Sequence, residues 1–212
     1  IAVISDIAAL GIETAARVGI PSVLIENFTW DWIYRQHKHK NKGMERHAEY
    51  LSSIFLQASL HLQCKPYCEQ MRGAISINPI SRAIRTESEQ VREALGCPAN
   101  KKIVFISMGG ISYSLPTLTA LEQFFSNILF VIAGHHEITS VPKNVRLLPT
   151  DTTLFHPDLV NAADAVIGKV GYSTITEVYQ AAVPFGYFSR PGNPENASLV
   201  SFLKKNISGI HF

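Results

Sequence analysis

Short apolar runs alternate with helix-like patterns along this chain. Residues 165–168 (AVIG) and 184–188 (PFGYF) are short continuous apolar segments, as expected of strands buried in a parallel sheet. Between them, apolar residues recur with the spacing of one helix face: Ile175, Val178, Tyr179 and Ala182. The pattern predicts a β-α-β unit, which requires a parallel crossover connection.

The same alternation extends over the rest of the chain. It predicts strands at 1–5, 21–25, 60–63, 74–85, 101–110 (with a glycine turn), 128–134 and 145–149, and helices at 7–18, 44–58, 87–95 and 115–125. The break at Asn78-Pro79 and the new strand from Lys101 predict two sheets. We assign 1–78 to the later part of a first Rossmann-like domain, 79–100 to a linker and helix, and 101–212 to a second domain.

The composition excludes several classes of protein. A chain with 46% hydrophobic residues can bury a sizeable core, whereas a net charge of +2 without aromatic-interleaved basic runs argues against nucleic-acid binding. The basic cluster 37–42 predicts a solvated loop, with contact to an anionic substrate or to a membrane surface as the alternative. No segment has the apolar length of a membrane span. We expect a fragment, because the chain begins and ends in strand-like segments.

Cysteine usage indicates a reducing compartment, so we expect a cytoplasmic protein. Three cysteines are too few for a disulfide framework. Cys64 and Cys68 lack a second metal-binding pair nearby, and the sequence therefore predicts no metal site and no cofactor.

A turn in the second half carries the clearest chemistry. Gly171 stands where the strand passes into the helix, and Ser173 and Thr174 follow in the first helical turn. Such a helix N-terminus at the carboxyl edge of a parallel sheet suits a phosphate, and Glu177 could accept hydrogen bonds from two ribose hydroxyls. The alternative is a capping box, in which Thr174 and Glu177 only satisfy free N–H groups.

Aromatic and acidic residues gather after the strand at 21–25. The segment 26–34 (ENFTWDWIY) contains Trp30, Asp31 and Trp32 at the carboxyl end of a strand, where α/β proteins bind ligands. We interpret it as a loop that lines a site, and the alternative is that the tryptophans fill a core.

The segment 171–196 (GYSTITEVYQAAVPFGYFSRPGNPEN) resembles the donor-binding segment of GT-B glycosyltransferases of the family 28 type, which includes the peptidoglycan GlcNAc transferase. Much of the remaining chain, including SD at 5–6, GIPSVLIENFTWDWIY, CKPYC, SEQVREALG and IVFISMGG, resembles the glycosyltransferase-like region of plant arabinokinases. Two departures are Ala182 for the usual glycine and Glu195-Asn196 where relatives carry Asp-Gln. The second leaves the donor sugar open.

This resemblance implies a GT-B fold, with two Rossmann-like doubly wound parallel-sheet domains of which the first is incomplete. It implies metal-independent transfer of a sugar from a nucleotide diphosphate-sugar, UDP-sugar first among them, to an unknown acceptor. The donor-binding residues implied are Gly109, Gly110, Gly171, Tyr172, Ser173, Thr174, Glu177, Glu195 and Asn196. The candidates for the general base are Asp6, Glu26 and Asp31, and Trp30 and Trp32 are placed on the acceptor side.

Two alternatives stay open beside the transferase. One is a nucleotide-sugar hydrolase or 2-epimerase that uses the same donor site. The other is a non-catalytic nucleotide-sugar-binding module fused to a sugar kinase.

Overall fold

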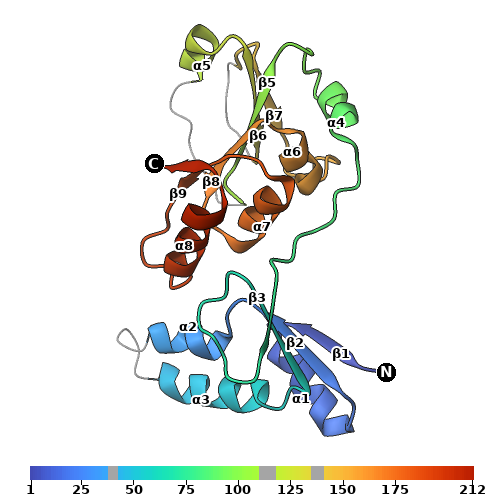
Figure 1. Cartoon of the computed structure of the whole chain (residues 1–212), viewed down its shortest axis with the longest axis vertical. Helices are drawn as coiled ribbons and strands as arrows, with labels where there is room; N and C mark the ends of the chain where they lie inside the picture. The colour runs from blue at the N-terminus through green and yellow to red at the C-terminus, as the bar shows by residue number, and fades with distance from the viewer. Residues whose placement is uncertain (38–42, 110–117, 135–140) are drawn as a thin grey trace. The chain divides into compact units, whose positions relative to one another are not determined.

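A computed structural model gives the structure of the protein at residues 1–37, 43–109, 118–134 and 141–212. These residues form two compact units. The first comprises Ile1–Ile80 with Gly192–Leu199, and the second comprises Ser81–Pro191 with Val200–Phe212. Each unit is built around its own sheet (Figure 1).

The first unit contains a parallel sheet with strand order β1-β2-β3-β4. Its strands are β1 (Val3–Asp6), β2 (Ser22–Glu26), β3 (Leu60–Cys64) and β4 (Ile75–Ile77). Its helices are α1 (Ala9–Val18), α2 (Trp30–Gln36) and α3 (Met44–Phe55). The core brings one face of β2 together with α1 and α3, through Ile12, Leu24, Ile54 and Phe55.

The second unit contains six parallel strands in the order β10-β9-β8-β5-β6-β7. They are β5 (Lys102–Ser107), β6 (Ile128–Ala133), β7 (Val145–Leu148), β8 (Ala165–Lys169), β9 (Phe185–Phe188) and β10 (Gly209–His211). The helices are α4 (Ser88–Ala94), α5 (Thr119–Phe124), α6 (His156–Ala162), α7 (Tyr172–Ala181) and α8 (Asn196–Asn206), of which α8 begins within residues assigned to the first unit. The parallel α/β architecture and the two separate sheets are therefore confirmed.

The order of the strands defines a switch point in the second sheet. From β5 the chain continues to β6 on one side, and it later returns to β8 on the other side of β5. In open parallel sheets, ligands bind outside the carboxyl ends of the strands where the order reverses. The ends of β5 and β8 are therefore the expected binding position of this unit.

Two local predictions were wrong. The segment 26–34 is not a continuous loop, because α2 begins at Trp30, where Asp31 and Arg35 form an i,i+4 ion pair along the helix. On α7, Ile175 and Val178 are buried as expected, but Tyr179 is exposed and Ala182 ends the helix in a left-handed conformation. Thr176 and Glu177 are buried instead. The Thr176 hydroxyl donates to the carbonyl oxygen of Ser173 within the helix, and polar side chains outside the helix bind the Glu177 carboxylate.

The domain limits at 78 and 100 stay a prediction about the whole protein. In the structure, α4 packs against α6 and belongs to the second unit. Arg92 on α4 donates hydrogen bonds to the carbonyl oxygens of Ala162 and Lys101. Arg92 also forms an ion pair with Asp164, which forms a second ion pair with Lys102.

Gly168 on β8 tests how closely β5 and β8 approach. A Cβ at this position would lie 2.4 Å from the backbone oxygen of Ser107, a contact that only a shift of a strand can relieve. We expect Gly168→Ala to lower the free energy of unfolding by about 1 to 3 kcal/mol, measured by urea denaturation. The matched control is Gly171→Ala, because a Cβ there meets nothing within 4 Å. Equal stability of the two variants would contradict the packing described.

Candidate functional site

The switch point brings two predicted glycines to neighbouring strand ends. Gly109 follows β5 with a positive φ of 58°, and Lys169 ends β8 directly before the turn at Gly171. The Lys169 ammonium donates a hydrogen bond to the Gly109 carbonyl oxygen at 3.0 Å. A Cβ on Gly109 would lie 2.9 Å from Lys169 Cε, so the absence of a side chain permits this approach. Gly110 lies outside the described residues.

The N-terminus of α7 follows the end of β8. Gly171 is the N-cap residue in an extended conformation, the helix runs for ten residues from Tyr172, and no side chain caps it. The first N–H groups of an α-helix have no partner within the helix, and the helix dipole adds positive potential at the same place. The capping-box alternative is wrong, because the helix starts before Thr174 and the Glu177 carboxylate bonds to other side chains.

Positive charge supplements the helix terminus. Lys169 is partly buried, and desolvation together with the nearby charge of Arg190 lowers the pKa of its ammonium group. An anion between these groups would relieve their mutual repulsion. A helix N-terminus with a lysine at the neighbouring strand end is an arrangement that suits an anion.

Glu177 is buried and is held by two partners from different segments. Its Oε2 lies 2.6 Å from His156 Nδ1, and its Oε1 accepts hydrogen bonds from Arg82 Nε at 3.0 Å and Nη2 at 2.7 Å. The residue is 3% exposed. Burial alone would raise the pKa of the carboxyl, but the hydrogen bonds and charges of His156 and Arg82 hold that pKa below its ordinary value.

His156 connects this carboxylate to the strand end. Its Nε2 lies 2.9 Å from Ser107 Oγ at the end of β5, and its ring contacts Phe105 edge-on. His156 is the first residue of α6. The side chains of β5, α6 and α7 thus form one chain of hydrogen bonds from Ser107 through His156 to Glu177.

Arg82 reaches Glu177 from the segment that leads into α4. Half of its side chain (53%) is exposed, and its guanidinium lies 5.0 Å from the centre of the Phe155 ring. Arg85 approaches the same ring to 4.0 Å, and its backbone N–H donates to Asp158 on α6. The segment before α4 is therefore attached to α6 and α7 beside the predicted ribose ligand.

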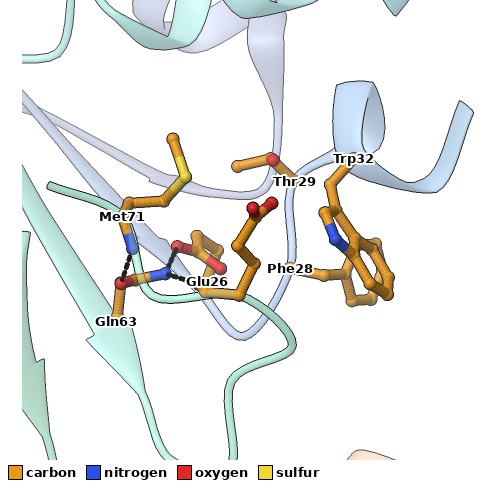
Figure 2. A pocket seen from close by; sticks show the side chains of 7 residues that line it. Glu26, Phe28, Thr29, Trp32, Gln63 and Met71 are labelled. Atoms are coloured by element: carbon orange, nitrogen blue, oxygen red, sulfur yellow. Dashed lines mark hydrogen bonds between the residues drawn. The ribbon is translucent and has the colours of Figure 1, made fainter. Parts of the chain in front are cut away.

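The candidates in the first unit do not share one position. Glu26 is buried and lines a pocket with Trp32 (Figure 2), whereas Asp31 is buried in α2 and paired with Arg35. Asp6 at the end of β1 and Trp30 on α2 are exposed. Of the predicted catalytic and acceptor residues, the structure brings together only Glu26 and Trp32.

The loop predicted to contact the donor sugar belongs to the segment 192–199, which groups with the first unit. There Glu195 Oε2 accepts a hydrogen bond from Asn27 at 3.2 Å. Asn196 begins α8. A role of Glu195 and Asn196 near a donor sugar stays a prediction.

Sequence reasoning missed Lys169, Arg190, His156 and Arg82 as site residues. Lys169 carried a usable signal, because it is a basic residue close before the glycine turn between strand and helix, where an anion is expected. Arg82 carried none, since it lies 95 positions from Glu177 in the chain. Within the described ranges, no group of three His, Cys, Asp or Glu side chains is arranged to hold a metal, and no helix is long and apolar enough to cross a membrane.

The comparison with family models gives no match. Among characterised proteins, the chain is similar to an L-arabinokinase of Arabidopsis thaliana, with 28% identity over 98% of this chain and 20% of the arabinokinase. The chain thus spans about a fifth of that protein.

Solved glycosyltransferases share the architecture at low identity. SnogD from Streptomyces nogalater is 17% identical with a TM-score of 0.59, over 100% of this chain and 60% of that chain. The spinosyn rhamnosyltransferase SpnG, solved with thymidine diphosphate, is 14% identical with a TM-score of 0.59, over 99% of this chain and 59% of that one. UGT2 of Phytolacca americana, solved with UDP-2-fluoro-glucose and pterostilbene, is 11% identical with a TM-score of 0.63, over 99% of this chain and 61% of that one.

At such identities the likeness concerns the fold, and it agrees with the two parallel sheets and with the switch-point turn. The chain spans about 60% of these glycosyltransferases. The protein has the fold of the GT-B glycosyltransferases.

Proposed function

We propose that the second unit binds a nucleoside diphosphate-sugar and that the protein uses it as the donor in sugar transfer. The observation that carries the proposal is the α7 N-terminus at the switch point, with Lys169 and Glu177 on either side of the Gly171 turn. A diphosphate needs N–H donors and positive charge, and a ribose needs a carboxylate within one helical turn of them. This unit offers both kinds of group.

The diphosphate lies against Gly171, Tyr172, Ser173 and Thr174 in this proposal, and the ribose hydroxyls bind Glu177. During transfer, negative charge grows on the leaving diphosphate. The helix dipole and the ammonium of Lys169 stabilise that charge without a metal ion, because they are oriented before the reaction starts.

We favour a UDP-sugar as donor and a cytoplasmic location. SpnG was solved with thymidine diphosphate and the Phytolacca enzyme with a UDP-sugar analogue, which supports a pyrimidine nucleotide. Three cysteines are too few for a disulfide framework, which supports a reducing compartment. The general base is proposed to be Glu26, with Asp6 and Asp31 as further candidates, and Trp30 and Trp32 are proposed to contact the acceptor.

A second function is favoured by one observation. The likeness to L-arabinokinase covers 98% of this chain, and that protein extends well beyond it. The alternative is a nucleotide-sugar-binding module without transferase activity. Incubation of the intact protein with radiolabelled UDP-sugars separates the two, because only the transferase releases UDP in the presence of an acceptor.

Gly171 tests the diphosphate site. We expect Gly171→Val to weaken UDP binding at least tenfold (about 1.4 kcal/mol), because the added methyl groups fill the space against the first turn of α7. The melting temperature should stay near the wild-type value, since a Cβ at this position meets nothing within 4 Å. Isothermal titration with UDP and with uridine makes the measurement, and uridine binding should change little. UDP affinity equal to that of the wild type would refute the site.

Arg82 tests whether a ribose must compete for Glu177. Both its guanidinium bonds go to Oε1, so removing them frees an acceptor. Because Arg82 is half exposed, the pair contributes little net energy, and we expect Arg82→Met to strengthen UDP binding about two- to fivefold. Glu177→Gln should weaken it. The matched control is Arg85→Met, which alters the same Phe155 stack without touching Glu177. Weaker binding by Arg82→Met would instead make Arg82 a ligand of the nucleotide.

The contacts of Glu177 also predict how the free energy of unfolding changes at acid pH. Its folded pKa is below the ordinary value of 4.5, so its contribution is complete above that pH and is lost as the pH falls towards the folded pKa. We expect Glu177→Gln to cost about 1 to 2 kcal/mol at pH 7 and progressively less below pH 4.5. Thermal unfolding from pH 7 to pH 3 measures this difference. Glu93→Gln, which removes an exposed carboxylate from α4, controls for net charge. A difference that does not vary with pH would contradict the ion pair.

A further inference from the structure

The first unit contains a small pocket near the carboxyl ends of β2 and β3. Its volume of about 180 Å³ includes open solvent, and the pocket has room for about one water-sized group. Seven residues line it: Glu26, Phe28, Thr29, Trp32, Gln63, Glu69 and Met71. Figure 2 shows Glu26 between Gln63 and Met71 on one side and the rings of Phe28 and Trp32 on the other.

Glu26 is buried in this pocket with one oxygen unused. The residue is 2% exposed. Its Oε1 accepts hydrogen bonds from Gln63 Nε2 at 2.8 Å and lies 2.6 Å from His61 Nε2. Its Oε2 has no hydrogen-bond partner among the residues that the structure describes. A buried carboxylate oxygen without a donor is costly, so this oxygen needs a donor from outside the described residues.

The neighbouring amide cannot turn to supply that donor. Both hydrogens of Gln63 Nε2 are engaged, one by Glu26 Oε1 and one by the carbonyl oxygen of Glu69. Gln63 Oε1 in turn accepts the backbone N–H of Met71. These bonds fix the amide (Figure 2), so the Glu26 carboxylate is held in place with Oε2 unsatisfied.

The charge of the lining selects the kind of donor. Glu26 and Glu69 are carboxylates, and none of the seven lining residues is a lysine or an arginine. Anionic ligands are therefore repelled. The rings of Phe28 and Trp32 attract cations through their faces, and a cationic donor forms a stronger hydrogen bond to a carboxylate than a neutral hydroxyl does. A guanidinium is larger than the water-sized space in the pocket, whereas an ammonium group is about the size of a water molecule.

We infer that this pocket is a binding site for the primary ammonium group of a small molecule. The ammonium donates to Glu26 Oε2, lies against the aromatic rings and is balanced by the charge of Glu69. The rest of the ligand extends through the open side. The pocket includes Glu26 and Trp32, which are also the proposed base and acceptor contact. Binding of an ammonium ligand is measured without any sugar transfer, so the two proposals can fail separately.

Ethanolamine and ethylene glycol provide the test, since they differ chiefly in an ammonium for a hydroxyl. The indole N–H resonance of Trp32, assigned with Trp32→Phe, is followed by NMR at constant ionic strength with sodium chloride as the salt control. We expect ethanolamine to shift this resonance with a millimolar Kd, and ethylene glycol to leave it unchanged. Glu26→Gln should weaken ethanolamine binding about tenfold or more, which is about 1.4 kcal/mol.

Two further variants keep the test decisive if Glu26→Gln fails to fold. Glu69→Gln removes an exposed pocket carboxylate and should weaken ethanolamine binding about threefold. Glu49→Gln removes an exposed carboxylate from α3, away from the pocket, and should leave the affinity unchanged. The inference is overturned if ethylene glycol binds as well as ethanolamine, if ethanolamine causes no shift, or if Glu69→Gln and Glu49→Gln have the same effect.

Discussion

The buried charge of Glu177 is the constraint on which the candidate donor site depends. A carboxylate that is 3% exposed must receive hydrogen bonds and positive charge, or it would be protonated. His156 and Arg82 provide both, and each comes from a different segment. The same contacts place α6 beside α7 and connect both to Ser107 on β5. The carboxylate that is proposed to receive a ribose therefore also holds the surrounding elements in position, and a nucleotide has to bind without leaving that charge unpaired.

Local patterns were enough to predict the framework. The apolar runs and the glycine turns indicated parallel strands, and the restart at Lys101 indicated a second sheet, because strand burial and turn chemistry are properties of a few consecutive residues. The helix at Trp30 was missed because its aromatic residues resembled a binding loop, while the Asp31–Arg35 pair that favours a helix was overlooked. The buried face of α7 was partly wrong for another reason. Nothing within the helix shows that Glu177 has partners 21 and 95 positions away.

The two buried glutamates also show what local sequence patterns do not predict. Glu26 and Glu177 each lie 2.6 Å from a histidine nitrogen, and each is almost inaccessible to solvent. Both oxygens of Glu177 have partners, whereas one oxygen of Glu26 has none among the described residues. The sequence around them does not distinguish the two: Glu26 ends a strand and Glu177 lies within a helix. The difference between an engaged carboxylate and one that needs a further donor is a property of tertiary structure.

The close approach of β8 to β5 at Gly168 has a consequence for how the proposed donor site could change during evolution. With the backbone oxygen of Ser107 2.4 Å from a would-be Cβ, a side chain at Gly168 would force the two strand ends apart. A Cβ on Gly171 meets nothing within 4 Å, so this position accepts a side chain. A directed-evolution library for altered nucleotide or sugar choice would therefore include Gly171 and leave Gly168 untouched.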